Sequence, residues 1–197
     1  MKRRIIIGIS GSSGVIYGVR ALQLLRDMND IETHLIVSAA ADRTLAVETS
    51  FRLEDLKAMC DVYHSNDNIA ASIASGSFVT DGMAVLPCSI KTLSAIANSF
   101  ADTLMVRAAD VVLKERRQLV LVVRETPLHK GHLELMLRAA DHGAQILPPV
   151  PAFYHAPRSV ADIVDHTVGK VFDALGIEHD LFQRWGERPP ASSPRRT

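Results

Sequence analysis

The hydrophobic residues of the chain form short continuous runs separated by amphipathic stretches. Residues 4–9 are rich in isoleucine and do not alternate with polar residues, which is typical of a strand buried on both faces. Residues 15–28 then carry apolar side chains at helical spacing, and residues 31–37 form a second apolar run. A strand, a helix and a strand in this order predict a parallel βαβ unit.

The same two patterns continue along the chain and are weakest within residues 39–77. Further strands are predicted at 61–64, 83–86, 118–123 and 145–147, and further helices at 53–59, from about 89, and at 103–116, 131–140 and 159–175. Pro87 is expected to end the strand before it. We predict one α/β domain over residues 1–185, a doubly wound three-layer αβα sandwich with a mostly parallel sheet of about six strands. Residues 186–197, rich in Pro, Ser and Arg, are expected to form a flexible tail.

Composition narrows the classes of function. The 197 residues include 22 Lys plus Arg and 22 Asp plus Glu, so the chain lacks the basic excess of a typical nucleic-acid-binding protein. No apolar run approaches the roughly 18 residues that span a bilayer. The run behind the basic N-terminus breaks at Gly8, so export is not expected. Two cysteines do not make a disulfide framework. We therefore expect a cytoplasmic protein that binds neither nucleic acid nor membrane.

Candidate chemistry lies directly after the predicted strands. In a doubly wound sheet, ligands bind beyond the carboxyl ends of the strands, where the strand order reverses. The first strand is followed by Ser-Gly-Ser-Ser-Gly at 10–14, the second by Ser38, and the strand at 83–86 by Pro87-Cys-Ser89. The strand at 118–123 is followed by Arg124 and Glu125. Hydroxyls at three strand ends, with a cation and a carboxylate at the fourth, indicate a ligand site at this edge of the sheet.

The glycine turn at 10–14 matches neither of two common phosphate-binding motifs. Gly8, Gly11 and Gly14 are three apart, which is not G-x-G-x-x-G, and no Lys follows as in a P-loop. Ser38 ends the second strand, where a dinucleotide site would carry Asp or Glu. Backbone N–H groups, hydroxyls and a helix N-terminus could still hold a phosphate or a flavin edge here. A tight turn without a ligand is the alternative.

The charged residues near the second half of the sheet allow two interpretations. Lys114-Glu-Arg-Arg117 could simply be the basic end of a helix, where cations complement the helix dipole. Arg124 and Glu125 point more strongly to function, because a cation can clamp an anion while a carboxylate acts as acid or base.

The histidines and cysteines do not predict a metal site or a nucleophile. His129 and His132 are three residues apart, but no Cys or carboxylate partner lies at ligand spacing. Cys88 has no identifiable base, so we expect a buried or site-lining thiol.

Taken together, the motifs resemble those of one family, the UbiX-type flavin prenyltransferases. The resemblance extends in order over about residues 4–186. The motifs are Gly8-Ile-Ser-Gly-Ser-Ser-Gly14, Ser75-Gly-Ser-Phe78, Pro87-Cys-Ser89, Thr92-Leu-Ser-Ala-Ile-Ala97, Arg107-Ala-Ala-Asp-Val, Leu113-Lys-Glu-Arg-Arg117, Val123-Arg-Glu125, Pro148-Pro, Phe153-Tyr-His155 and Arg184-Trp185.

The resemblance implies a flavodoxin-like Rossmann fold that binds FMN and a homo-oligomer, with a dodecamer among the expected forms. Members of the family join the dimethylallyl group of dimethylallyl phosphate to N5 and C6 of reduced FMN, without a metal. The prenylated FMN serves a UbiD-type decarboxylase of aromatic acids.

The resemblance also assigns roles by position. FMN is expected to contact Gly11, Ser12, Ser13, Ser38, Ser89, Ile90, Lys91, Thr92 and Arg124. Dimethylallyl phosphate is expected to contact Arg107, Lys114, Tyr154 and Lys170, with Phe78 and Trp185 lining the prenyl pocket. The expected catalytic residues are Glu48, Glu125 and Lys114. These side chains would gather at one edge of the sheet, so a neutral chain would carry a charged site.

Two features depart from the family pattern, and two other functions are alternatives. Lys170 stands where many members carry Arg, and Ile90-Lys91 is bulkier than the residues often found there. A flavin-dependent decarboxylase of aromatic acids or cysteine-ended peptides is the first alternative. The peptide decarboxylases carry an Asn within the segment equivalent to 89–92 and a His after the second strand, and this chain has neither. A flavin carrier without catalysis is the second alternative.

Overall fold

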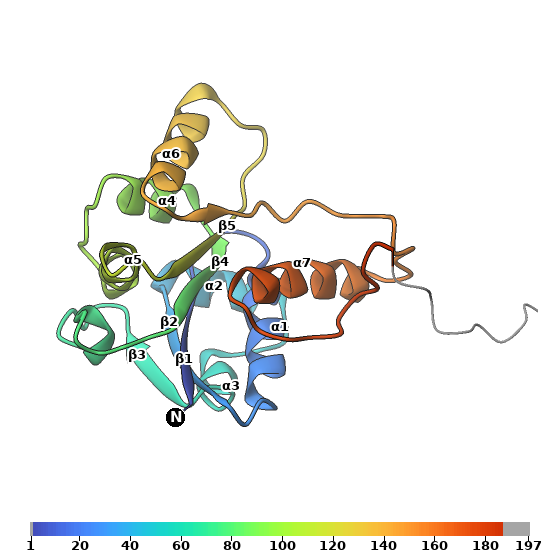
Figure 1. Ribbon diagram of the computed structural model, residues 1–197, viewed down its shortest axis with the longest axis horizontal. Coiled ribbons are helices and arrows are strands. Elements are labelled where there is room, and N and C mark those ends of the chain that lie inside the picture. The colour runs from blue at the N-terminus through green and yellow to red at the C-terminus, as the bar shows by residue number, and fades with distance from the viewer. Residues whose placement is uncertain (1, 187–197) are drawn as a thin grey trace, which may run out of the picture.

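A six-stranded parallel sheet forms the centre of the computed structural model, which describes residues 2–186 (Figure 1). In the order β3-β2-β1-β4-β5-β6, each strand pairs in parallel with its neighbour. This is the strand order of a doubly wound Rossmann sheet, which confirms the predicted architecture. The strands are β1 (Arg3–Ile9), β2 (Ile31–Val37), β3 (Val62–Ser65), β4 (Gly82–Cys88), β5 (Gln118–Val123) and β6 (Gln145–Ile146). Residues 187–197, most of the expected tail, lie outside the described residues.

Helices cover both faces of the sheet and complete the three-layer αβα sandwich (Figure 1). One face packs against α1 (Val15–Arg26), α2 (Ala39–Glu48), α3 (Leu53–Lys57) and α7 (Val160–Ala174). The other face packs against α4 (Ile90–Ala97), α5 (Leu104–Lys114), α6 (Lys130–Asp141) and the short 3-10 helix η1 (Ser72–Ala74). Within residues 2–186, no helix is long and apolar enough to cross a membrane.

The central strands are apolar throughout because alternate side chains fill two different cores. Ile5 and Ile7 of β1 belong to the core on the α1 and α7 face, whereas Ile6 belongs to the core on the α4 and α5 face. Strand β5 divides in the same way, with Val120 in the first core and Leu121 in the second. Both faces of these strands are therefore buried, which explains the absence of polar alternation in the sequence.

Two elements differ from the sequence prediction. Helix α2 lies in the segment with the weakest pattern, because Ala41 and Leu45 are its only buried residues. Strand β4 does not end before Pro87 but continues to Cys88. The pairing of β4 with β5 changes register between Val85 and Cys88, so the missing N–H of Pro87 falls at an irregularity of the ladder.

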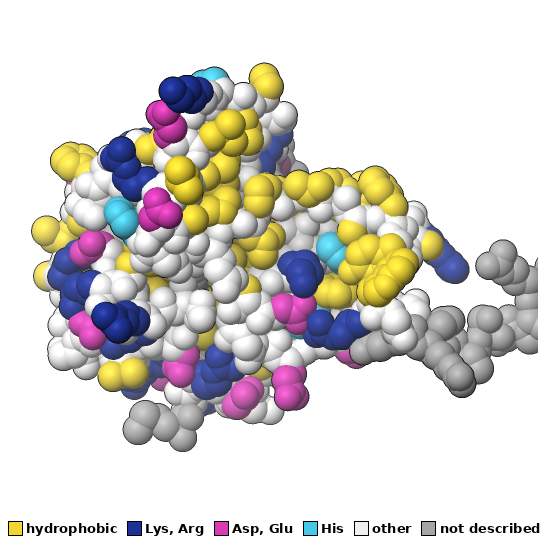
Figure 2. All heavy atoms as spheres, turned by 45° about the horizontal axis from the view of Figure 1, so that its top comes forward, with side chains coloured by type: hydrophobic (Ala, Val, Ile, Leu, Met, Phe, Trp, Pro, Cys, Tyr) yellow, Lys and Arg dark blue, Asp and Glu magenta, His cyan; other side chains and the backbone are white. Residues whose placement is uncertain are grey.

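An extended segment, residues 147–159, leads away from the sheet to the start of α7 (Figure 1). Figure 2 shows hydrophobic side chains gathered along this segment and over α6. The large apolar residues exposed on these elements and beside them are Leu133, Leu137, Val150, Phe153, Tyr154, Val160 and Trp185. We call this set the apolar arm surface. Exposed apolar patches of this kind typically mark a contact with another protein chain.

Candidate functional site

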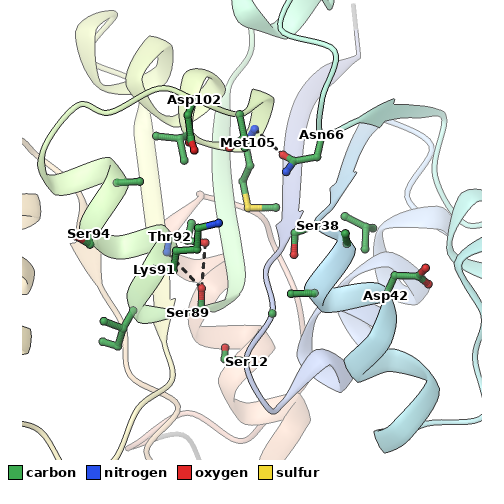
Figure 3. A pocket seen from close by; sticks show the side chains of 18 of the residues that line it. Ser12, Ser38, Asp42, Asn66, Ser89, Lys91, Thr92, Ser94, Asp102 and Met105 are labelled. Carbon is green, nitrogen blue, oxygen red and sulfur yellow. Dashed lines mark hydrogen bonds between the residues drawn. The ribbon is translucent and has the colours of Figure 1, made fainter.

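A cleft of about 1340 Å³ opens at the carboxyl edge of the sheet. Residues that follow β1, β2, β3, β4 and β5 all line it, so it spans the point between β1 and β4 where the strand order reverses. Figure 3 shows side chains from both halves of the sheet around this space. Doubly wound sheets bind their ligands at such a switch point.

All nine residues expected to contact FMN line this cleft, and so does the expected catalytic residue Glu125. The nine are Gly11, Ser12, Ser13, Ser38, Ser89, Ile90, Lys91, Thr92 and Arg124. They come from the ends of four strands and the starts of the helices that follow. The structure thus brings together one complete group of the predicted site residues.

Ser10 links the turn after β1 to the segment between β4 and α4, and both segments border the cleft. Its buried hydroxyl donates to the Pro87 carbonyl at 2.9 Å and accepts from the Ser89 N–H at 2.7 Å. The Ser10 N–H donates to the same carbonyl at 3.2 Å. The glycine turn after β1 and the start of α4 are therefore fixed relative to each other by a side chain that does not itself line the cleft.

Ser38 and Ser89 cap α2 and α4, two of the helices that begin at the cleft. Ser38 Oγ accepts from the Ala41 N–H at 3.1 Å at the start of α2. Ser89 Oγ accepts from the Thr92 N–H at 3.3 Å and lies 3.1 Å from the Thr92 hydroxyl at the start of α4 (Figure 3). Because a helix N-terminus carries partial positive charge, this arrangement favours an anionic group such as a phosphate.

The glycine turn approaches α2 closely and carries an unpaired hydroxyl. A Cβ on Gly11 would lie 2.3 Å from the Cβ of Ala40, so only glycine fits there without a shift of the turn. Ser12 Oγ is buried and has no hydrogen-bond partner among the described residues. Buried hydroxyls are nearly always paired. Ser12 is therefore suited to bind a ligand oxygen in the cleft.

These features fit FMN. Its phosphate matches the two helix N-termini, and its hydroxyls and phosphate oxygens can pair with Ser12 Oγ. Ligand pockets usually measure about 300–1,000 Å³. The larger volume of this cleft leaves room for a second molecule beside the flavin.

The sequence patterns missed one wall of the cleft, which comes from the end of β3 and the start of α5. The Asn66 carbonyl accepts from the Leu104 N–H at 2.8 Å, and Asn66 Oδ1 accepts from the Met105 N–H at 3.0 Å. Figure 3 shows the Met105 side chain in the space between Ser38 and the Ser89–Thr92 group. Applying the strand-end rule to the strand predicted at 61–64 would have indicated Asn66, because β3 ends at Ser65.

Arg124 and Glu125 reach the cleft together from the end of β5. The Arg124 N–H donates to the Cys88 carbonyl at 3.0 Å, which anchors the backbone of Arg124 beside β4. Glu125 Oε1 accepts from the Thr126 N–H at 2.9 Å. A cation and a carboxylate in this position can stabilise developing negative charge and transfer a proton.

Glu48 lies at the end of α2 and caps another helix, α1. Its Oε2 accepts from the Gly14 N–H at 2.8 Å and from the Val15 N–H at 3.4 Å. A carboxylate at this position complements the helix dipole. Glu48 does not line the cleft within one copy of the chain and instead fixes the end of the glycine turn.

Two cations expected to bind dimethylallyl phosphate lie on α5, away from the cleft. Arg107 donates to the Asp110 carboxylate at 2.8 Å, and Lys114 pairs with Glu115. A third, Lys170, lies on α7 with its Nζ 3.3 Å from Asp173. Each of these cations is paired with a carboxylate close to it in the sequence.

The aromatic residues expected to line one prenyl pocket lie in two places. Phe78 packs edge-on against His34, with 5.4 Å between the ring centroids. Tyr154, within the extended segment before α7, packs edge-on against Trp185, which follows α7, with 5.7 Å between the ring centroids. One copy of the chain therefore does not gather the expected substrate residues at one edge of the sheet, and their assignment to the substrate stays a prediction.

Cys88 is a core residue. Complete burial raises the pKa of its thiol, which disfavours the thiolate that nucleophilic catalysis would need. The chemistry of the cleft must therefore come from other groups.

Known proteins resemble this chain over most of its length. The family model described as Flavoprotein matches residues 1–172. The flavin prenyltransferase UbiX of Escherichia coli K12 is 62% identical over 185 residues, covering 93% of this chain and 98% of that protein. A crystal structure of AnUbiX (PadA1) in complex with FMN and dimethylallyl pyrophosphate matches with a TM-score of 0.93 and 44% identity, covering 96% of this chain and 100% of that chain. The dodecameric FMN-dependent UbiX-like decarboxylase from Escherichia coli O157:H7 matches with a TM-score of 0.91 and 49% identity, covering 93% and 100%.

Proposed function

Because the chain belongs to the UbiX-type flavin prenyltransferases of the Flavoprotein family, we propose that it joins the dimethylallyl group of dimethylallyl phosphate to N5 and C6 of reduced FMN. The bond between the prenyl carbon and the phosphate oxygen breaks, and its electron pair leaves with the phosphate. One carbon bond forms at N5 and one at C6, and each position loses a proton. One proton adds to the prenyl double bond and the other is taken by the phosphate, so the products are reduced FMN enlarged by C5H8 and inorganic phosphate.

The cleft at the switch point carries this proposal. It combines capping hydroxyls at two helix N-termini with the unpaired Ser12 hydroxyl, a set suited to FMN. The reduced flavin supplies the nucleophile, so the protein needs none of its own. The task of the chain is to bind both phosphates, orient the reacting groups and move protons.

A neighbouring copy of the chain is proposed to complete the substrate site. Negative charge develops on the leaving phosphate, and cations must lie there to stabilise it. Arg124 lines the cleft, whereas Arg107, Lys114 and Lys170 lie elsewhere on the same copy. The UbiX-like decarboxylase from Escherichia coli O157:H7 is dodecameric. The apolar arm surface supports assembly of this chain as well, because it offers exposed apolar area for contact between copies.

Glu125 is proposed to relay a proton between the flavin and the phosphate. It lines the cleft beside Arg124, whose charge favours a phosphate nearby. The proposed role of Glu48 differs, since its carboxylate already accepts two backbone N–H groups at the start of α1. In one copy it supports the glycine turn.

The prenylated FMN is proposed to serve a UbiD-type decarboxylase of aromatic acids, and the enzyme is proposed to act in the cytoplasm. Family membership supports the first proposal. The free thiols of Cys60 and Cys88 support the second, because reducing compartments keep cysteines unpaired.

Mass spectrometry of the flavin tests the proposed reaction. Purified protein is incubated without oxygen with reduced FMN and dimethylallyl phosphate, and the expected product has the mass of reduced FMN plus C5H8. An unchanged flavin mass, from protein shown to bind FMN, would contradict the proposal. A parallel incubation with dimethylallyl pyrophosphate, the ester bound to AnUbiX, shows which ester is used. Release of carbon dioxide from an aromatic acid by this protein alone would favour the decarboxylase alternative.

Two variants separate catalysis from storage of the cofactor. Glu125→Gln and Lys114→Ala should slow product formation, because a proton relay and a phosphate-binding cation are lost. Lys130→Ala is a control, since the Lys130 side chain is 89% exposed on α6 and has no proposed role. A flavin carrier would retain full function in all three variants.

A further inference from the structure

The hydroxyl of Tyr154 is tied to a buried histidine of α7. Tyr154 Oη lies 3.1 Å from His166 Nε2. Tyr154 is 48% exposed, whereas His166 is only 7% exposed. The polar tip of an accessible side chain is therefore held by a group fixed inside the fold.

Aromatic rings enclose His166 and limit its movement. His155 stacks on it in parallel with 4.8 Å between the ring centroids, and Phe182 packs against it at 4.6 Å. The Tyr154 ring itself contacts His166 edge-on at 5.8 Å. Because rings packed in this way keep their rotamers, Nε2 stays directed at the Tyr154 hydroxyl.

Lys170 lies on the same face of α7 as His166. The two residues are four positions apart, which places them one helical turn from each other. The Tyr154 hydroxyl is bound to that face, so a hydroxyl and an ammonium group that are far apart in the sequence are brought to one place. A hydroxyl donor beside a cation suits a phosphate ester.

We propose that His166 is a positioning residue for prenyl transfer, which donates its Nε2–H to Tyr154 Oη and leaves the Tyr154 hydroxyl hydrogen free for the phosphate of dimethylallyl phosphate. This inference rests on the proposed function, because it needs that phosphate at Tyr154. His166 acts only through Tyr154 and does not touch the substrate.

The direction of the hydrogen bond follows from the number of available hydrogens. The oxygens of a phosphate dianion can only accept, so Tyr154 must donate to them, and a tyrosine hydroxyl has one hydrogen. A Tyr154 that donated to His166 would have none left for the phosphate. Burial lowers the pKa of His166, and the nearby His155 and Lys170 lower it further, so the ring is neutral at pH 7 and carries one N–H. That hydrogen must lie on Nε2 for Tyr154 to bind phosphate.

A matched pair of variants tests this role. His166→Gln keeps a side-chain N–H donor, whereas His166→Met has none, and both side chains are unbranched and favour helices. His166→Met should lower kcat/KM for dimethylallyl phosphate roughly 3- to 10-fold, the equivalent of one ordinary hydrogen bond. His166→Gln should retain most of the activity, and the FMN dissociation constant should be unchanged in both. In a Tyr154→Phe background, His166→Met should cause no further loss, because the hydroxyl it positions is gone.

Several results would overturn the inference. Additive losses in the double variant would show that His166 does not act through the Tyr154 hydroxyl. Equal loss in His166→Gln and His166→Met, or failure of both to fold while Tyr154→Phe folds, would make His166 a packing residue. A wild-type protein that forms no prenylated flavin would instead contradict the proposed function, and the two failures are therefore distinguishable.

Discussion

Replacing Ser12 by alanine should weaken FMN binding without destabilising the protein in the absence of FMN. Ser12 Oγ is buried at the cleft and has no hydrogen-bond partner among residues 2–186. In the FMN-free protein this buried hydroxyl makes no hydrogen bond to the protein, so replacing it by hydrogen removes no protein hydrogen bond. In the FMN complex the same removal deletes a bond to the ligand.

The size of the effect follows from the charge of the bonded group. A hydrogen bond to a charged phosphate contributes about 1.5–3 kcal/mol, and each 1.4 kcal/mol changes a dissociation constant tenfold. Ser12→Ala should therefore raise the FMN dissociation constant roughly 10- to 150-fold. The free energy of unfolding without FMN should stay within about 0.5 kcal/mol of wild type.

Ser10→Ala is the matched control for this prediction. Ser10 Oγ is also buried, but it accepts from the Ser89 N–H at 2.7 Å and donates to the Pro87 carbonyl. Its removal leaves the Ser89 N–H unpaired, so the FMN-free protein should lose about 1–3 kcal/mol of stability. In a chain of this length, that corresponds to a decrease of Tm of about 2–4 °C for each kcal/mol.

Urea denaturation without FMN and fluorescence titration with FMN measure the two quantities. The reasoning requires opposite patterns: Ser10→Ala loses stability, and Ser12→Ala loses FMN affinity alone. Unchanged FMN affinity in Ser12→Ala, or a loss of stability as large as that of Ser10→Ala, would refute the assignment of Ser12 as a ligand-binding hydroxyl.

Three further predictions concern the glycine turn, Asp173 of α7 and the cap of α1 by Glu48. Gly11→Ala should cost about 1–3 kcal/mol of stability and lower FMN affinity, because its Cβ would clash with α2. Gly8→Ala should keep FMN affinity in the same titration, because the three atoms nearest to its new Cβ belong to methionine side chains and lie at 3.4–3.5 Å. Burial alone would raise the pKa of Asp173, but its hydrogen bonds, led by that from Arg184, hold the pKa at about 2. The resulting stabilisation, roughly 2 kcal/mol, is present above pH 4 and lost as the pH falls towards 2, so the unfolding free energies of wild type and Asp173→Asn should converge over that range. Glu48→Ala should lower the free energy of unfolding by about 0.5–2 kcal/mol through loss of the α1 cap, and Glu48→Gln by less, as urea denaturation can show.

The sequence predicted well which residues line the cleft, because their position depends on local order. In a parallel sheet, the carboxyl ends of neighbouring strands meet at one edge, so residues directly after the strands must lie together. Ser12, Ser38, Ser89 and Arg124 were found in this way, and all four line the cleft. The reasoning needed only the strand boundaries and the parallel arrangement.

The positions of the residues expected to bind the prenyl substrate could not be predicted from sequence order, since these positions depend on packing between elements. Phe78 follows no strand, and its ring packs against His34 of β2, whereas Tyr154 contacts His166 of α7 and Trp185. Helix α2 was missed because a helix with only two buried residues leaves almost no periodic signal. Residues placed by helix faces, or by contacts between copies, need a structure to locate them.

The zero net charge of the chain and its two anionic ligands are compatible because of how the cations are paired. Arg107, Lys114 and Lys170 each lie beside a carboxylate of the same or adjoining segment, in partly exposed ion pairs. Such pairs contribute only about 0–1 kcal/mol, so a phosphate dianion can compete for the cation at small cost. Arg124 has no carboxylate within ion-pair distance among the described residues, and it already lines the cleft. We therefore expect Arg124 to bind a phosphate first, and the paired cations to exchange their carboxylates for the substrate only where a neighbouring copy completes the site.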